Sequence, residues 1–153
     1  MKWNALRSES CPVARGLSVI GDRWTLLILR ECFFGVRRFD DFQQRLGITR
    51  HVLAERLRHL EDTGVLRREV YQDRPLRHEY RLTEAGLALN AVLVTLIDWA
   101  DRYAPDDTGS SVTLVASDTG AAVQPLLIDA ATGQPITART VRAVPREDPG
   151  GAD

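Results

Sequence analysis

Arginine and histidine side chains gather in the middle of this sequence. Residues 49–81 hold eight arginines and all three histidines of the chain. A guanidinium group presents a planar fork of N–H donors that matches phosphate oxygens and guanine edges. This concentration of donors predicts a surface that binds nucleic acid.

Motifs for catalysis or metal binding are absent from the sequence. It contains no nucleophile elbow and no glycine-rich phosphate loop, and no histidine lies near Cys11 to act as a base. The two cysteines, Cys11 and Cys32, lack metal-ligand spacing and are too few for a disulfide framework. We therefore expect no catalytic residues, no metal site, no cofactor and no enzymatic activity.

Charge is distributed unevenly along the 153 residues, although the formal net charge is only −1. Residues 1–104 carry 17 basic and 14 acidic side chains, whereas residues 105–153 carry 3 and 7. The acidic excess is confined to the end of the chain, so the net charge does not argue against DNA binding by the first part.

The sequence shows neither a membrane span nor an export signal. No apolar run approaches the ~18 residues that a membrane helix needs. The first residues, MKWNALRSESCPVARG, lack the apolar core of a secretory signal. We expect a cytoplasmic protein with no membrane partner.

Proline, glycine and capping residues divide the first part of the chain into helices, which we predict over residues 12–20, 22–35 and 39–46. Gly47 then allows a tight turn, and Thr49 caps a further helix that ends at Gly64. Two helices joined in this way predict a helix-turn-helix, whose second helix enters the major groove of DNA.

The hydrophobic period becomes that of strands after Gly64. Residues 65–71 and 79–83 are predicted strands joined by the arginine-rich tip QDRPLRH, and one long helix is expected from Glu84 to Tyr103. A basic hairpin directly after a helix-turn-helix is typical of a winged helix. The predicted fold class is therefore mainly α with a β-wing.

Eight side chains of this region are predicted to contact DNA. Arg50 and His51, at the start of the second helix, are expected to reach base edges, whereas the hairpin tip is expected to lie along the adjacent minor groove or backbone. The full predicted set is Thr49, Arg50, His51, Arg56, Arg58, Arg74, Arg77 and His78.

Each helix arginine also has an alternative role as a solvated surface charge. Arg58 could pair with Glu55, Glu61 or Asp62, and such a pair contributes a few tenths of a kcal/mol. The hairpin tip offers few acidic partners beyond Asp73, so the cluster as a whole favours DNA binding.

Residues 11–86 resemble the HxlR-type (MarR-like) winged-helix family of bacterial regulators. The resemblance rests on the CP start, the GDRWTLLILRE stretch, the LEDTGVL segment and the YRLTEAG exit. It implies a sequence-specific transcription regulator. It also implies a homodimer that places two recognition helices in successive major grooves of double-stranded DNA, and hence a palindromic operator.

The apolar pattern of the long helix is a second reason to expect a dimer. Its apolar side chains fall on more than one face, which a domain of this size cannot bury alone. The resemblance places the interface on the N-terminal helix and this last helix. The predicted interface residues are Leu17, Leu93, Leu96, Trp99 and Tyr103.

Cys11 is a sensor candidate by the same resemblance, because some family members sense oxidants or electrophiles through the cysteine of the CP pair. A helix N-terminus favours negative charge, and Arg15 lies one turn further on. Cys32 lies late in an apolar helix and is expected to be buried, which favours a one-cysteine mechanism. The alternative is that Cys11 is only a small residue at a packed interface.

Two further functions stay open. A small molecule could bind without a covalent bond at the dimer interface, where Trp3, Trp24, Trp99 and Tyr103 could line a cavity, although such aromatic residues often serve only packing. A winged helix can also be a protein-interaction module, but such a module would not need arginines on both helix and wing.

The composition changes at about residue 104. We predict a DNA-binding and dimerisation domain over residues 1–104 and a small β-rich extension with a disordered tail over residues 105–153. The short β-rich runs at 112–116, 123–128 and 137–144 predict a small sheet or a pair of hairpins. The extension resembles one that carries a small zinc ribbon in some relatives. Thr119, Asp129 and Thr132 stand where cysteines would be, so we expect strand pairing without a metal.

Overall fold

The computed structural model of the chain describes residues 6–145. The chain forms two compact units that meet between Ile97 and Asp98. Trp3 and the predicted disordered tail after residue 145 lie outside the described residues.

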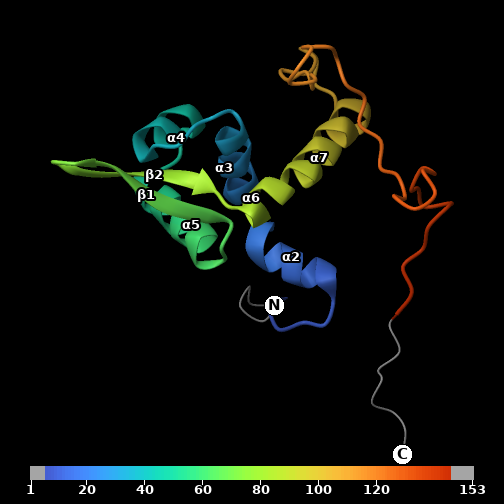
Figure 1. Cartoon of the computed structure of the whole chain (residues 1–153), viewed down its shortest axis with the longest axis horizontal. Helices are drawn as coiled ribbons and strands as arrows, with labels where there is room; N and C mark the ends of the chain where they lie inside the picture. The colour runs from blue at the N-terminus through green and yellow to red at the C-terminus, as the bar shows by residue number, and fades with distance from the viewer. Residues whose placement is uncertain (1–5, 146–153) are drawn as a thin grey trace, which may run out of the picture. The chain divides into compact units, whose positions relative to one another are not determined.

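Helices and one hairpin make up the regular structure of the described chain (Figure 1). The helices are α2 (Pro12–Ile20), α3 (Arg23–Phe33), α4 (Phe39–Leu46), α5 (Arg50–Asp62), α6 (Glu84–Ala88) and α7 (Asn90–Tyr103). Strands β1 (Leu66–Asp73) and β2 (Leu76–Leu82) pair antiparallel and extend away from the helices. The predicted fold class, mainly helical with a β-wing, is confirmed.

Capping residues set the helix-turn-helix as the sequence predicted. The Asp22 carboxylate accepts a hydrogen bond from the Trp24 amide at 2.9 Å and starts α3. Gly47 ends α4 with a φ of +61°, a left-handed conformation that favours glycine. Thr49 then accepts from the Val52 amide and starts α5. The turn that aims α5 is therefore encoded locally.

The core of the first unit lies where α3, α4 and α5 meet. Its fully buried apolar side chains are Ile28, Leu29, Phe42, Leu53, Leu57 and Leu60. The Tyr80 ring of β2 packs edge-on against Phe42, with ring centroids 6.5 Å apart. One apolar cluster thus holds the recognition helix and the wing on the same support.

The wing is longer than the sequence predicted. Pairing runs from Leu66 opposite Leu82 out to Asp73 opposite Leu76, with an irregularity between Val70 and Gln72. The predicted seven-residue tip therefore shrinks to Arg74 and Pro75. The outer hairpin lacks the alternation of apolar and polar residues that predicts a strand, because both of its faces meet solvent. The backbone hydrogen bonds between the two strands continue there nevertheless.

The predicted long helix is broken at Leu89. The Leu89 amide bonds to the carbonyl of Gly86, three residues back, so the chain tightens by a local turn between α6 and α7. Gly86 is buried and lies so close to β1 that an added Cβ would be 2.3 Å from the Val65 carbonyl oxygen. This close approach fixes α6 against the base of the wing.

In the extension, two tight antiparallel turns take the place of the longer strands that the sequence predicted. Among residues 105–145 the only strand-like pairings are two single bridges, Val115 with Ala122 and Ile128 with Pro135. The runs are short and mostly exposed, and a lone hairpin without a covered face is marginal in water.

At one tight turn of the extension, the side chains of Asp129 and Thr132 bond to each other. The Thr132 hydroxyl donates to the Asp129 carboxylate at 2.7 Å. A hydrogen bond thus closes this turn in the described extension.

None of the helices within residues 6–145 has the length and apolar character needed to cross a bilayer.

Candidate nucleic-acid interface

Helix α5 is held from both sides by polar contacts as well as by its leucines. The Arg56 guanidinium lies 3.8 Å from the Asp22 carboxylate at the start of α3. Near the other end of α5, His59 Nε2 lies 3.1 Å from the Val19 carbonyl oxygen of α2. These contacts fix the orientation of α5 relative to α2 and α3.

A buried carboxylate joins α3 to α4. Glu31 is 2% exposed, and its oxygens accept hydrogen bonds from Arg30 and Arg45. Burial alone would raise the pKa of Glu31, but the hydrogen bonds and charges of Arg45 and Arg30 outweigh it and hold that pKa below its ordinary value. The sequence analysis missed this group, because Glu31 looks like any other charged residue in the helix.

Most of the predicted DNA-contacting side chains reach solvent. Thr49, Arg50, His51 and Arg58 are exposed on α5 and its cap. Arg74 and Arg77 are exposed at the end of the hairpin, whereas His78 is half-buried. The exposed side chains thus lie at the start of α5, on its outer face and at the wing tip.

Three of these arginines carry no ion pair within the described chain: Arg58, Arg74 and Arg77. The alternative role for Arg58, pairing with its helix neighbours, is therefore not seen. Unpaired, exposed guanidinium groups keep all their donors available to phosphate oxygens.

Arg50 contacts α4 instead of pointing freely into solvent. Its guanidinium lies 3.2 Å from both Asp40 and Gln43 and stacks 4.8 Å from the Phe39 ring centroid. The Arg50 and Asp40 side chains are 68% and 86% exposed, so this pair is weak and easily exchanged for another partner.

Arg56 differs from Arg58, although both lie on α5. The Arg56 side chain is only 25% exposed and pairs with Asp22 and Glu55. Its position indicates a role in packing α5 against α3.

One basic residue near the wing, Arg38, was not among the residues predicted from the sequence to contact DNA. Arg38 caps α4 and stacks over the Tyr71 ring of β1, 4.5 Å from the centroid. The adjacent Arg37–Arg38 pair just before a helix was the available signal.

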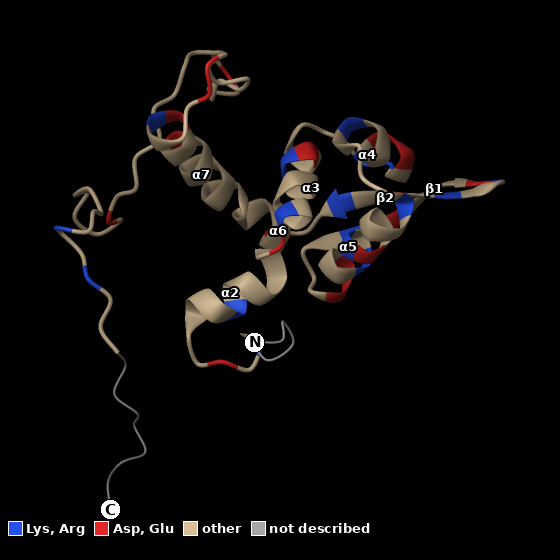
Figure 2. Ribbon diagram, turned by 180° about the vertical axis from the view of Figure 1, so that it is seen from behind, with Lys and Arg blue, Asp and Glu red and all other residues tan. Residues whose placement is uncertain are grey.

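Figure 2 shows that basic and acidic segments alternate on α5 and along the hairpin. Which arginines are available to DNA therefore depends on which of them form ion pairs with these acidic neighbours.

Comparisons with known proteins agree with this geometry. The model of the HxlR-like helix-turn-helix family matches residues 19–108. The chain belongs to this family. It is a transcription regulator with a helix-turn-helix domain.

Some relatives match almost the whole chain, whereas others match little beyond its helix-turn-helix unit. An HTH-type transcriptional regulator of Mycobacterium tuberculosis is 48% identical over 139 residues, which cover 91% of this chain and 88% of that protein. The crystal structure of PA1607, a candidate transcription factor, matches with a TM-score of 0.82 and 41% identity over 92% of this chain and 98% of its own.

The redox regulator HypR, in its reduced form, matches with a TM-score of 0.56 and 34% identity over 60% of this chain and 92% of its own. HypR therefore matches little beyond the helix-turn-helix unit. The matches to the first two proteins are longer than residues 1–104 and must include part of the extension.

Helix α7 of this HxlR-family chain carries an exposed apolar stripe. Val92, Leu96, Trp99 and Tyr103 are 41–70% exposed and follow one another at helical spacing. On α2, Leu17 is 45% exposed. Leu93 differs from the other predicted interface residues, because it is 8% exposed and belongs to the core of its own unit.

The two cysteines have different surroundings. Cys11 is exposed at the N-cap of α2, and the Arg15 guanidinium donates to the carbonyls of Glu9 and Ser10, just before it in the chain. Cys32 is half-buried at the end of α3, and burial raises the pKa of its thiol to about 12. Cys32 is therefore a protonated, weakly nucleophilic thiol at neutral pH.

Proposed function

We propose that this HxlR-family regulator binds a palindromic operator in double-stranded DNA as a homodimer in the cytoplasm. Each α5 enters a major groove, and each wing tip lies along the adjacent backbone or minor groove. The observation that carries the proposal is a set of exposed arginines, Arg58, Arg74 and Arg77, on α5 and the wing of a helix-turn-helix protein. None of them forms an ion pair within residues 6–145.

Within this site, the residues divide into two roles. Arg50 and His51 at the start of α5 contact base edges, with Arg50 leaving Asp40 to do so. Arg58, Arg74, Arg77 and Thr49 contact phosphates, which position the protein without distinguishing sequences. Arg56 does not belong to this DNA surface, because it is paired with Asp22. His78 is half-buried and lies at the edge of the surface.

The test measures DNA affinity by fluorescence anisotropy on a duplex from the protein's own upstream region and on a random duplex. The Arg74→Ala/Arg77→Ala variant should bind both duplexes more weakly and flatten the salt dependence by about 0.9 per lost phosphate contact. Arg50→Ala should weaken the upstream duplex selectively. Arg142→Ala, which removes an exposed arginine of the extension, is the matched control.

An unchanged salt dependence in the wing variant would contradict the backbone role. Equal loss on both duplexes in Arg50→Ala would contradict its role in base recognition. If wild-type protein binds neither duplex above background, the chain is a protein-interaction module instead.

For the signal, we propose modification of Cys11 by an electrophile such as a quinone. The sulfur adds to a ring carbon, a C–S bond forms, and the thiol proton ends on the reduced ring as a hydroquinone thioether. Support comes from the exposure of Cys11, the raised pKa of the Cys32 thiol and the likeness to the redox regulator HypR.

Benzoquinone treatment should change the operator affinity of wild type and of Cys32→Ser to the same extent, and leave Cys11→Ser unchanged. The adduct would appear as a mass increase on the peptide that contains Cys11. A response that survives in Cys11→Ser would remove Cys11 as the sensor.

A further inference from the structure

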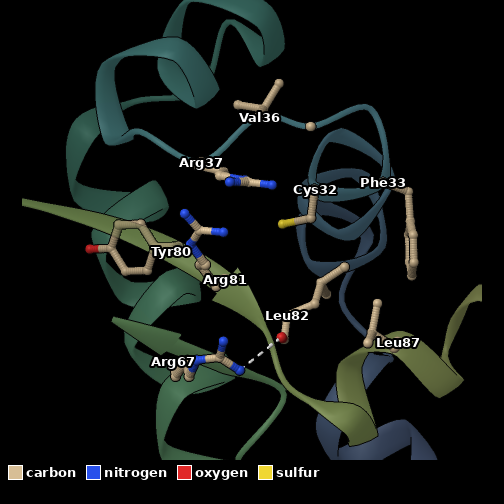
Figure 3. A pocket seen from close by; sticks show the side chains of 10 residues that line it. Cys32, Phe33, Val36, Arg37, Arg67, Tyr80, Arg81, Leu82 and Leu87 are labelled. Atoms are coloured by element: carbon tan, nitrogen blue, oxygen red, sulfur yellow. Dashed lines mark hydrogen bonds between the residues drawn. The ribbon is translucent and has the colours of Figure 1, made fainter. Parts of the chain in front are cut away.

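A cavity of about 360 Å³ lies at the base of the wing, entirely within the first unit (Figure 3). It is walled by the end of α3, the loop before α4, both strands and α6. This volume is at the lower end of the range for small-molecule sites in proteins. None of the predicted DNA-contacting or dimer residues lines it.

Positive charge exceeds negative charge around this cavity. Arg67 and Arg81 both pair with Glu69, and Arg81 also pairs with Glu79. Arg37, the third guanidinium of the lining, forms no ion pair in the part of the chain that the structure describes. Glu69 attracts Arg37 only from beyond ion-pair distance, so three guanidinium groups share the two carboxylates Glu69 and Glu79.

The side chains that line the cavity suit a ligand with one anionic group and an otherwise apolar structure. Figure 3 shows Arg37 and Arg81 directed into the same space, with the Cys32 sulfur beside them. Phe33, Leu82 and Leu87 form the apolar side of the lining. Because the Cys32 thiol is protonated at neutral pH, it can donate weakly to an anion but does not attack an electrophile there.

We propose that this cavity binds a small organic carboxylic acid with a flat apolar body. Its carboxylate lies between Arg37 and Arg81, and its body packs against Phe33, Leu82 and Leu87. The charge-assisted hydrogen bonds supply orientation, and the apolar contacts distinguish the ligand from an inorganic anion or a DNA phosphate.

Occupation of this cavity would act on the wing. The Tyr80 amide of β2 donates to the Arg37 carbonyl at 2.7 Å, so the loop that carries Arg37 is already bonded to the wing. A carboxylate held by Arg37 and Arg81 would add a second link between the loop and β2. The angle of the wing to α4 and α5 would then depend on the ligand, and this consequence rests on the proposed DNA-binding function.

The binding test needs no DNA. The full chain is titrated calorimetrically with 1-naphthoate, with its neutral isostere 1-naphthamide and with inorganic phosphate. Naphthoate should bind in the micromolar to millimolar range and the other two at least about tenfold more weakly. Arg37→Gln should weaken naphthoate at least about tenfold. Arg38→Gln, which changes the neighbouring arginine outside the cavity, should leave binding unchanged.

Several results would overturn the proposal. These are no heat with millimolar naphthoate, equal binding of naphthamide, phosphate binding as tight as naphthoate, or an Arg37→Gln variant that binds like wild type. Circular dichroism establishes that each variant is folded.

A separate arm measures operator affinity with and without naphthoate. A protein that binds naphthoate through Arg37 but binds no DNA refutes the proposed function and leaves the ligand site standing. A protein that binds DNA but not naphthoate refutes the proposed ligand site and leaves the proposed DNA-binding function standing.

Discussion

At the scale of single residues, the same residue type has opposite roles according to its surroundings. Arg56 and Arg58 are two positions apart on α5, yet Arg56 is paired and half-buried. Arg58 is exposed and forms no ion pair in the part of the chain that the structure describes. Helical geometry explains the difference, because positions two apart point to different faces. Only Arg58 is left with donors for a phosphate.

Glu31 shows how a buried charge can stabilise this fold. Its neutral substitute Glu31→Gln keeps the shape but loses the charge that Arg30 and Arg45 hold. We expect Glu31→Gln to lower the free energy of unfolding at pH 7 by about 2 kcal/mol, the scale of hydrogen bonds to charged groups. Urea unfolding measures this, and Glu55→Gln, in an exposed pair, is the matched control.

The loss should depend on pH in a defined direction. The folded pKa of Glu31 lies below its ordinary value of 4.5, so the carboxylate contributes its stability above that pH and loses it as pH falls through the folded pKa. The stabilities of wild type and Glu31→Gln should therefore converge as the pH falls from 4.5 through the lowered folded pKa of Glu31. A difference that stays constant from neutral to acid pH would contradict a charge effect.

At the scale of elements, the wing is anchored at its base by a close backbone approach. Thr83 donates to the carbonyl of Gly64 at 2.6 Å and accepts from the Gly86 amide at 3.1 Å. Gly86 in turn lies against the Val65 carbonyl. This junction joins the end of β2, the start of β1 and α6.

Gly86→Ala should therefore destabilise the protein, because its Cβ would meet a backbone oxygen that has little room to move. We expect a loss of about 3 kcal/mol, at the upper end of the cost of overpacking. Gly16→Ala on α2 is the matched control, since nothing lies within 4 Å of its added Cβ. That control should be neutral or stabilise by up to about 1 kcal/mol. Thermal unfolding of both variants checks this, and equal midpoints would refute the close approach.

At the scale of the whole molecule, the apolar stripe of α7 needs a partner surface, and we propose a second copy of the chain. Four large apolar side chains along one helix exceed what isolated surface residues explain. In this arrangement the stripe would pair two recognition helices for a palindromic operator.

A Leu96→Glu/Trp99→Glu variant should separate the protomers, because it places charge in the proposed apolar contact. Sedimentation equilibrium should show a dimer dissociation constant raised by roughly 100-fold or more. Leu126→Glu, at a 68% exposed apolar residue of the extension, should leave the assembly unchanged. A monomeric wild type would contradict the proposal directly.

The extension distinguishes two kinds of relative. The Mycobacterium tuberculosis regulator and PA1607 match almost the whole chain, whereas HypR matches 60% of it. The helix-turn-helix unit therefore occurs both with and without this segment. In this chain a hydrogen bond between Asp129 and Thr132 closes one of its turns.

The sequence by itself determined the helix-turn-helix, the existence of the wing and the family. These features depend on local chemistry, namely the caps at Asp22 and Thr49, the left-handed turn at Gly47 and the leucine spacing of α5. Each acts over a few neighbouring residues, so a linear pattern is sufficient to predict it.

Only the tertiary structure decided which charged side chains form ion pairs and where a cavity remains. Glu31 pairs with Arg45 and Arg56 pairs with Asp22 across segments far apart in the chain, and Arg37 and Arg81 line one cavity. The break at Leu89 and the weak pairing of the extension also depend on what each segment packs against. Pairing and burial are properties of three-dimensional neighbours, which a one-dimensional pattern of residue types does not specify.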